Sequence, residues 1–315
     1  KENEVLEEFA KTNGHDIVRV EDGFLRSVNL GIQKTTPSSL CFDSKGIYYD
    51  ARQPSELEDL FNNYQCSNEE LERGKKILDS ILSHKLSKYN NTKHVSFDSK
   101  FGDSNSHRIL VIGQVEGDMS LKYGCDTEMT NNDLVRLARS ENPDSEIFYK
   151  IHPDVFGKES DNPEEVKDIC IIINENLSVD SVLSGVDKVY TITSLMGMEA
   201  VLRGKEVVCI GAPFYSNWGL TDDRQKVNRR NRTLSLIELF TITYVIFPIY
   251  IDVHTLKKAT PEEAIVNLAN DYENIIVLGN EDQTFNNNLL KSNKKFSIIK
   301  FISSRIRKSF KKIFA

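Results

Sequence analysis

The chain has 315 residues, of which 39% are hydrophobic and 28% are charged. This length is enough for two domains with their own cores. The formal net charge of −7 argues against a general nucleic-acid binder, which needs a basic surface. The charge is uneven, because residues 291–315 carry lysines and arginines but no acidic residue. The sequence therefore predicts an acidic body with a basic C-terminal tail.

Cysteine usage and the absence of targeting signals limit where the protein acts. The five cysteines form no CxxC pair and lie mostly in apolar, strand-like contexts. This pattern favours reduced thiols in a cytosolic protein over a disulfide framework. No signal peptide opens the chain, and no apolar run approaches the length of a membrane span. Because the chain begins within a helix-like segment, we expect its N-terminal domain to lack a first strand or two.

The first 105 residues alternate helical and extended patterns. We expect helices at 5–12, from 54 onward and at 67–86, a strand at 17–20 with a turn at 21–23, and paired strands at 39–42 and 46–49. Ser67 is the expected cap of the long helix, with Glu70 at the capping-box position. The polar composition of residues 88–105 predicts an interdomain linker.

A second block begins near residue 106 and repeats a strand–helix order. We expect strands at 109–112, 147–151, 170–173, 189–191 and 207–210, with helices at 133–140 and 178–184. This order predicts a parallel, doubly wound sheet, whose functional loops follow the carboxyl ends of the strands. Two more helices are expected at 235–244 and 261–272.

The segment 190–205 is the most informative part of the chain. It predicts a strand that turns into a helix capped by Thr193 or Ser194, with Glu199 just over one turn inside. The free N–H groups and the dipole at a helix N-terminus attract an anion. A carboxylate at that depth can accept hydrogen bonds from a ribose diol. The segment therefore predicts a site for an activated nucleotide donor.

An amide and two carboxylates follow the first strand of the second block, at Gln114, Glu116 and Asp118. Paired carboxylates at a strand end can serve as nucleophile, base or stabiliser of an oxocarbenium-like sugar centre. The glycine pattern of a dinucleotide-binding loop is absent. The alternative interpretation is a solvated acidic turn.

Cationic side chains suggest where an anionic substrate binds. Lys150 and His152 share one face of the expected strand, where they can meet a phosphate or a sugar carboxylate. Arg26, beside Glu21 and Asp22, can hold a carboxylate bidentately. The alternatives are a histidine that only packs at the strand end and an arginine in a surface ion pair.

Two further segments have an ambiguous role. The aromatic loop 213–224 suits a sugar or base platform, or equally a hydrophobic plug between domains. Residues 294–314 place apolar side chains at helical spacing among lysines and arginines. A polybasic amphipathic helix of this kind is suited to an anionic membrane surface, and the alternative is a solvated, fraying terminus.

Six segments together carry a family resemblance. They are EDGFLRSVNLG (21–31), GIYYDA (46–51), GQVEGD (113–118), YKIHPD (149–154), TSLMGMEA (193–200) and FYSNWGLT (214–221). In this order and spacing, over residues 15–255, they resemble the KpsC/LipB capsule polysaccharide family. The resemblance implies an α/β fold of the GT-B type with two Rossmann-like domains, of which the N-terminal one is truncated here.

The resemblance also implies a division of the chain. Residues 1–105 would be the incomplete, acceptor-side domain with its linker, and residues 106–255 the CMP-binding domain. Helices at 256–290 and the basic tail at 291–315 would follow. In this family the product is a short Kdo linker on a lipid, made at the cytoplasmic face of the inner membrane, on which the capsule chain is built before export.

The implied reaction is the retaining transfer of β-Kdo from CMP-Kdo to a lipid-linked or Kdo-primed acceptor. Asp118 is then the first choice for the nucleophile and Glu116 the second, with Glu21 or Asp22 as acid/base. The remaining substrate-binding candidates are Gln114, Thr193, His152, Ser194 and Glu199, the last three for CMP, and Lys150 or Arg26 for the Kdo carboxylate.

No metal and no cofactor are expected, because a helix N-terminus with His152 and Ser194 could neutralise the single phosphate of CMP-Kdo. Expected partners are the nucleotide sugar, a lipid-linked acceptor, an anionic membrane surface and capsule assembly proteins, but no nucleic acid. The expected location is the cytoplasmic side of the inner membrane. Two alternatives stay open: a non-catalytic component of the capsule machinery, and a transferase for another CMP-activated sugar.

Overall fold

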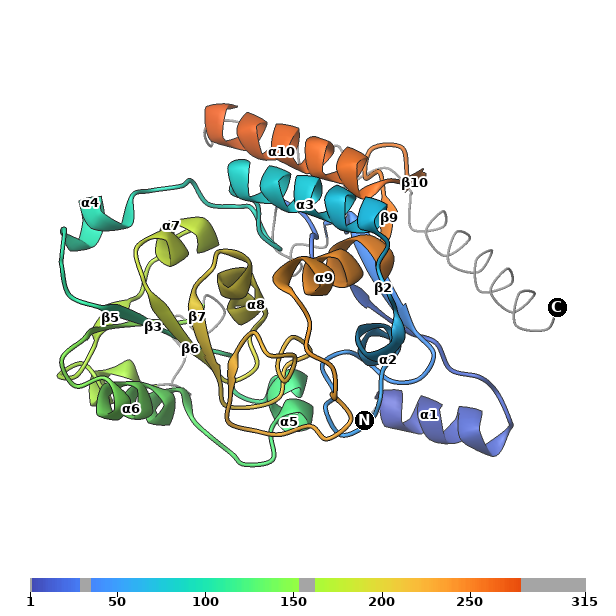
Figure 1. Cartoon of the computed structure of the whole chain (residues 1–315), viewed down its shortest axis with the longest axis horizontal. Coiled ribbons are helices and arrows are strands. Elements are labelled where there is room, and N and C mark those ends of the chain that lie inside the picture. The colour runs from blue at the N-terminus through green and yellow to red at the C-terminus, as the bar shows by residue number, and fades with distance from the viewer. Residues whose placement is uncertain (1, 29–34, 153–161, 279–315) are drawn as a thin grey trace.

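The middle of the chain forms a six-stranded sheet in the order β5-β4-β3-β6-β7-β8. In the computed structural model, which describes residues 2–28, 35–152 and 162–278, all its strand pairs are parallel (Figure 1). The strands are β3 (Arg108–Ile112), β4 (Glu146–Lys150), β5 (Ile171–Ile173), β6 (Lys188–Thr191), β7 (Glu206–Cys209) and β8 (Asp222–Asp223). The chain builds outward from β3 in one direction, then returns to its other side with β6. The predicted parallel, doubly wound sheet is confirmed.

Helices cover both faces of this sheet. Alternate side chains of β3 divide between two cores, with Ile109 and Val111 packed in the cluster that includes residues of α6 (Asn131–Glu141). The next side chains, such as Leu110, face the side of α7 (Val179–Ser184) and α8 (Leu195–Leu202). Helix α8 is buried over nearly its whole length because it packs on β6 and β7 as well as on α7 and α9 (Leu236–Phe240).

A second, antiparallel sheet joins segments far apart in the sequence. Its order is β1-β2-β9-β10. These strands are β1 (Arg19–Asp22), β2 (Ser39–Asp43), β9 (Ile249–Ile251) and β10 (Lys258–Ala259). Strand β9 lies within the predicted 106–255 block, yet it pairs with β2 of the first block. The predicted four-part division of the chain stays a prediction, with sheet pairing crossing its boundary at residue 105.

Several other helices lie around this second sheet (Figure 1). They are α1 (Glu2–Thr12), α2 (Glu56–Asn63), α3 (Asn68–Ser83), α10 (Pro261–Leu278) and a π-helical turn, η4 (Thr241–Ile246), that continues α9. The predicted start of the long helix is confirmed, because the Ser67 hydroxyl accepts from the Glu70 N–H and the Glu70 carboxylate accepts from the Ser67 N–H. The basic tail at 291–315 lies outside the described residues.

The prediction of a strand at 46–49 is wrong. The Asp43 carboxylate accepts hydrogen bonds from the N–H groups of Lys45, Gly46 and Glu56, which closes a turn directly after β2. Strand β2 pairs instead with β1 and β9. The predicted turn at 21–23 also begins later than expected, because residues 21 and 22 belong to β1.

The predicted linker at 88–105 packs onto the parallel sheet. It contains a short helix, α4 (Phe97–Phe101), whose Phe97 ring is buried with its centroid 4.9 Å from that of Phe148 on β4. Composition misleads here because two phenylalanines in a polar segment are enough to anchor it. The linker is therefore part of the core and not a free tether.

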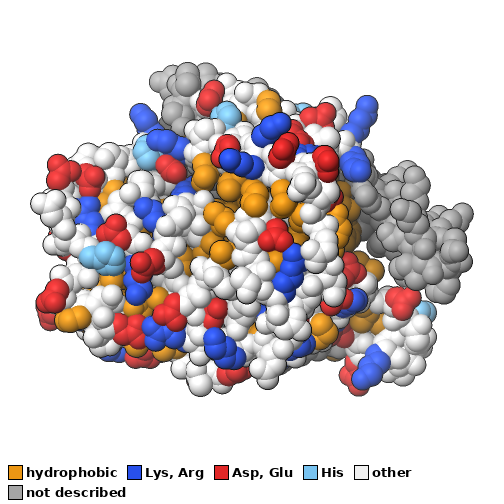
Figure 2. Space-filling model, viewed as in Figure 1, with side chains coloured by type: hydrophobic (Ala, Val, Ile, Leu, Met, Phe, Trp, Pro, Cys, Tyr) orange, Lys and Arg blue, Asp and Glu red, His pale blue; other side chains and the backbone are white. Residues whose placement is uncertain are grey.

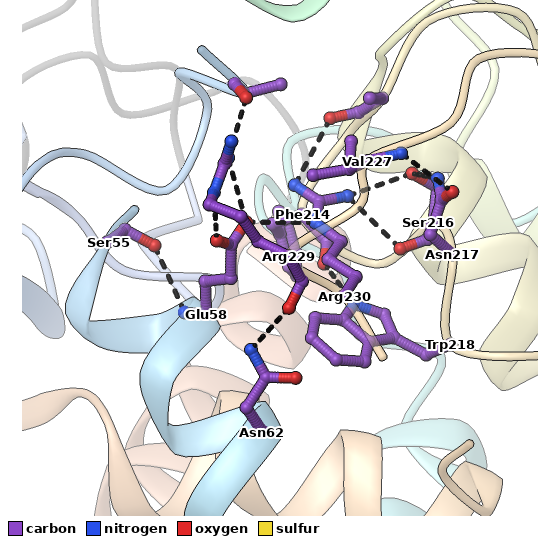
Figure 3. Close-up of polar contacts among 12 residues, drawn as sticks. Ser55, Glu58, Asn62, Phe214, Ser216, Asn217, Trp218, Val227, Arg229 and Arg230 are labelled. Atoms are coloured by element: carbon purple, nitrogen blue, oxygen red, sulfur yellow. Dashed lines mark hydrogen bonds and ion pairs between the residues drawn. The ribbon is translucent and has the colours of Figure 1, made fainter. Parts of the chain in front are cut away.

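Charged and aromatic side chains fasten the two parts of the molecule together (Figure 3). The buried Glu58 carboxylate of α2 accepts from Arg229 Nε at 2.7 Å and from Arg230 Nε at 3.1 Å. Next to this pair, Trp218 is fully buried, with its ring centroid 5.1 Å from that of Phe61. The aromatic loop 213–224 thus holds its indole in the core, as the plug alternative expects.

We expect Arg230→Met to destabilise the protein strongly. The guanidinium is buried and also donates to the carbonyls of Pro213 and Ser216, so its loss leaves Glu58 and two carbonyls short of partners. Removing one partner of a buried ion pair costs about 3–5 kcal/mol. Chemical denaturation should therefore show a free energy of unfolding lowered by about this amount.

A surface pair supplies the control. Arg73 and Glu262 join α3 to α10 at 2.7 Å, but both side chains are nearly half exposed. Charged side chains of both signs are interspersed over this face, around an apolar area near α9 (Figure 2). Exposed pairs contribute about 0–1 kcal/mol, so Arg73→Met should change stability little. An equal loss of unfolding free energy in the two variants would contradict a larger contribution from the buried ion pair of Glu58 and Arg230.

Candidate active site

The predicted site residues of the second block meet at the carboxyl edge of the parallel sheet. The loop after β3 contains Gln114 and Asp118, and the loop after β6 contains Thr193 and Ser194. These two strands are neighbours, and the direction of strand addition reverses between them. Crevices at such switch points are where open α/β sheets bind their ligands. The topology therefore points to this edge as the ligand site.

Gln114 ties the two loops together. Its side-chain oxygen accepts from the Thr193 N–H at 2.7 Å, and its amide nitrogen donates to Thr193 Oγ1 at 3.1 Å. Its backbone exchanges two 2.9 Å hydrogen bonds with the side chain of Asn131. Thr193 Oγ1 also lies 3.1 Å from Ser120 Oγ. Gln114 and Thr193 are both buried, and their polar atoms hydrogen-bond to each other and to neighbouring residues of the protein. Their contact with substrate stays a prediction.

Asp118 lies at the rim of the same edge. It is exposed and is the N-cap of α5 (Met119–Gly124), where its carboxylate accepts from the Ser120 N–H at 2.8 Å. Gly117 before it has a φ of 80°, a conformation that favours glycine, so the turn that presents Asp118 depends on this residue. Glu116 is exposed in the same turn. Both carboxylates are therefore open to solvent at this edge of the sheet.

Ser194 caps α8 as predicted. Its hydroxyl accepts from the Met196 N–H at 3.3 Å, and its own N–H donates to Thr191 Oγ1 at 3.1 Å. The carbonyl of Ser194 accepts from the buried Tyr215 hydroxyl at 2.5 Å. These contacts hold the N-terminus of α8 against the end of β6 and the loop after β7.

Glu199 lies deeper than a simple ribose ligand would. It is 5% exposed, and its Oε1 accepts from the Lys88 N–H at 3.0 Å. Burial raises the pKa of this carboxyl, while Arg203 and Lys88 oppose the rise. Glu199 therefore binds the backbone of the segment at Lys88, where the chain passes from its first part to the parallel sheet. Its hydrogen bonding to a ribose stays a prediction.

Lys150 is the most unusual cation of the site. It ends β4, is 7% exposed, and its ammonium has no hydrogen-bond partner among the described residues. Burial lowers its pKa from 10.5 to about 8. His152 follows two residues later and is partly exposed. A buried ammonium without a partner is costly, which is expected where a ligand supplies the missing anion.

Of the three candidates in the first block, two pair with each other and one does not. Arg26 is buried, its Nε donates to Asp22 Oδ2 at 2.5 Å, and its Nη1 donates to the hydroxyls of Ser27 and Thr35 at 3.0 Å each. Arg26 and Asp22 thus form an ion pair, as the alternative for this arginine expects, but the arginine is buried and not at the surface. Glu21 is partly buried, and burial raises its pKa, with the Lys88 ammonium acting against the rise.

Two residues of this region carried no individual signal in the sequence. Burial raises the pKa of the Glu21 carboxyl, and Tyr49 is among the groups that lower it, while burial, Glu21 and Asp118 are among the causes that raise the pKa of the Tyr49 phenol. Lys88 was part of a polar linker, yet its backbone carbonyl accepts from the N–H groups of Arg26 and Ser27. Tyr49 lies in one of the motifs of the family resemblance, whereas nothing in the composition around Lys88 singles it out.

The described residues were also compared with three other kinds of site: a surface hollow, a metal site and a membrane span. A hollow of about 620 Å³ lies at the β8 edge, lined by residues such as Asp222, Lys226 and Arg230, and contains none of the predicted site residues. Within the described ranges, no group of three or more histidine, cysteine and acidic side chains is arranged to hold a metal ion. None of the helices in the same ranges combines the length and the hydropathy of a membrane span.

Comparisons with known proteins show the family of this chain. The family described as "Capsule polysaccharide biosynthesis protein" matches residues 3–252. LpsZ of Rhizobium meliloti, a "lipopolysaccharide-processing protein", is 46% identical over 80% of this chain and 58% of its own length. LipA of Neisseria meningitidis serogroup B, a "capsule polysaccharide modification protein", is 37% identical over 83% of this chain and 37% of its own. The chain thus spans less than two thirds of the length of each of these curated relatives.

Two solved structures are similar over most of the chain. The β-Kdo 2,4 transferase of Thermosulfurimonas dismutans KpsC has a TM-score of 0.77 and 37% identity, covering 82% of this chain and 81% of that one. The β-Kdo 2,7 transferase of the same KpsC has a TM-score of 0.68 and 36% identity, covering 81% and 78%. The predicted family resemblance and the GT-B-like α/β fold are confirmed, while the roles of the individual site residues stay predictions.

Proposed function

Because this chain belongs to the capsule polysaccharide biosynthesis protein family, we propose that it is a glycosyltransferase that moves β-Kdo from CMP-Kdo onto a lipid-linked or Kdo-primed acceptor. The observation that carries the proposal is Lys150 at the ligand edge of the parallel sheet, a buried cation for which the described part of the chain provides no hydrogen-bond partner. The donor offers two anionic groups, a phosphate and a sugar carboxylate. The similar solved structures, which are described as Kdo transferases, support the choice of sugar.

The structure favours one cation for the sugar carboxylate. Arg26 already pairs with Asp22, so Lys150 is the better candidate of the two. The phosphate is then assigned to the N-terminus of α8 at Ser194, with His152 beside it. The proposal uses no metal and no cofactor.

The proposed chemistry is a double displacement that retains configuration. The Asp118 carboxylate forms a bond to the anomeric carbon while the bond to the phosphate oxygen breaks, and CMP leaves with the electron pair. An acceptor hydroxyl then attacks that carbon, the bond to Asp118 breaks, and the hydroxyl proton goes to Glu21. We favour Glu21 over Asp22 because its raised pKa suits a base and because Asp22 is engaged by Arg26.

The proposal is tested by CMP release from a set of donors. With a Kdo-primed lipid as acceptor, CMP-Kdo should be consumed. Turnover of another CMP-activated sugar, with CMP-Kdo left intact, would favour the alternative transferase. Tight binding of CMP-Kdo without turnover for any acceptor would favour a non-catalytic component of the capsule machinery.

We also propose that the protein acts as a peripheral protein at the cytoplasmic face of the inner membrane, near capsule assembly partners. The support is the sequence of residues 291–315, which combines lysines and arginines with apolar residues at helical spacing. Deleting these residues should release the protein from vesicles that contain anionic lipid. Cosedimentation measures this, and vesicles of neutral lipid are the control. Unchanged binding after the deletion would contradict the membrane role of the tail.

A further inference from the structure

Ser120 lies in the first turn of α5, two residues after Asp118. Residues 116–119 are exposed, whereas Ser120 is partly buried. Its backbone N–H donates to the Asp118 carboxylate at 2.8 Å, and its Oγ lies 3.1 Å from Thr193 Oγ1 in the loop after β6. Ser120 therefore contacts the proposed nucleophile through its backbone and the neighbouring loop through its side chain.

The Thr193 hydroxyl that Ser120 contacts is itself held in place. It accepts from Gln114 Nε2 at 3.1 Å, and the Thr193 N–H donates to Gln114 Oε1 at 2.7 Å. A hydroxyl can accept and donate at the same time, so the contact with Ser120 does not compete with the one to Gln114. The next residue, Ser194, caps α8. A chain of hydrogen bonds thus runs from the start of α8 to Asp118.

The other end of α5 is fastened independently of Ser120. The Tyr123 carbonyl accepts from the Ala51 N–H at 3.0 Å, and the Gly124 carbonyl accepts from the Ala212 N–H at 2.7 Å. Among the described residues, the contact between Ser120 and Thr193 is the one side-chain hydrogen bond from residues 118–122 to another loop. Loss of the Ser120 hydroxyl should therefore loosen the turn that carries Asp118 and leave α5 in place.

We propose that Ser120 is a positioning residue that holds the Asp118 carboxylate at a fixed place relative to the N-terminus of α8. This inference rests on the proposed function, in which Asp118 attacks the sugar while the start of α8 holds the phosphate that leaves. Both groups must be placed accurately, because a shift of about 1 Å can cost roughly 10²-fold in rate. The hydroxyl acts through Asp118 and needs no contact with the sugar.

The first experiment compares Ser120→Ala with Ser120→Thr. Ser120→Ala keeps the N–H that Asp118 accepts from but loses the contact with Thr193. We expect kcat to fall roughly 10- to 100-fold with little change in KM for CMP-Kdo. Ser120→Thr restores a hydroxyl and should recover most of the rate. A wild-type kcat in Ser120→Ala would overturn the proposal.

Ser184→Ala is the matched control. It removes a serine hydroxyl that donates to the Ser181 carbonyl of its own helix, α7, at 3.0 Å. This change lies outside the proposed machinery and should leave kcat and KM at their wild-type values.

A double-variant cycle tests whether Ser120 acts through Asp118. If it does, Ser120→Ala should lower the residual rate of Asp118→Asn far less than it lowers the wild-type rate. The same fold-loss in both backgrounds would overturn the proposal, because the hydroxyl would then act independently of the carboxylate.

A last readout does not need turnover. The bond to Asp118 protects the N–H of residue 120, so in the full chain without substrate its hydrogen exchange, followed by NMR, should be several-fold faster in Ser120→Ala and near wild type in Ser120→Thr. Unchanged exchange in Ser120→Ala would overturn the positioning role even if the enzyme transfers Kdo. Faster exchange with threonine rescue, in a protein that transfers no sugar, would support the positioning of Asp118 and contradict the proposed function instead.

Discussion

Asp118→Asn should abolish sugar transfer while the protein stays folded. Under the proposed mechanism the carboxylate forms the bond to the sugar, and an amide cannot replace it. We expect kcat to fall by roughly 10³-fold or more, as for other lost nucleophiles. Asparagine caps helices as well as aspartate does, so the hydrogen bond to the Ser120 N–H that begins α5 is kept. Thermal unfolding checks the fold, and CMP release with acceptor present checks the rate.

Glu116→Gln is the matched control for this variant. Glu116 is exposed in the same turn, two residues earlier, and was the second choice for the nucleophile. The mechanism predicts that Glu116→Gln keeps most of the activity. If it loses turnover while Asp118→Asn retains it, the roles of the two carboxylates are exchanged. If both variants transfer sugar at the wild-type rate, no carboxylate of this turn is the nucleophile.

Lys150→Met should weaken donor binding and stabilise the folded protein at the same time. A hydrogen bond to a charged group contributes about 1.5–3 kcal/mol, so the dissociation constant of CMP-Kdo should rise roughly 10- to 100-fold. Methionine fills a similar space without a buried charge. Calorimetric titration and chemical denaturation measure the two effects. Lys188→Met, a change at the opposite, amino-terminal edge of the same sheet, should leave donor binding unchanged.

The pH dependence of stability separates Lys150 from an ordinary lysine. Its pKa is lowered from 10.5 in the unfolded chain to about 8 in the fold. Between these pH values the unfolded chain binds more protons, so the stability of the wild type rises with pH across this window. The penalty of the buried charge is complete below pH 8, where Lys150→Met should be more stable by up to about 3 kcal/mol. A less stable variant with unchanged donor binding would contradict this assignment.

The sequence was most informative where a pattern is local. Buried runs such as 109–112 and 189–191 need only hydrophobicity and length to be recognised as strands, and Ser67 with Glu70 is a capping signal that acts within one turn. The order of these strands then placed Gln114, Asp118 and Ser194 at one edge of the sheet, because carboxyl ends of parallel strands meet there.

Long-range partners were the part that the sequence could not supply. Residues 46–49 form no strand because Asp43 closes a turn directly after β2. The partner of β2 is instead β9, where Ser39 pairs with Tyr250, 211 residues later in the chain. Whether an arginine binds a ligand or a neighbour depends on where Asp22 points. Lys88 matters through its backbone, which composition does not reveal.

The most direct measurement is product analysis of the full chain with CMP-Kdo and a synthetic Kdo-primed lipid. Mass spectrometry should show the lipid heavier by one Kdo residue, and NMR should show the new residue in the β configuration. That result would establish a retaining Kdo transferase, because the configuration of the donor is kept. Recovery of unchanged acceptor, from protein that binds CMP-Kdo and is fully folded, would contradict the account.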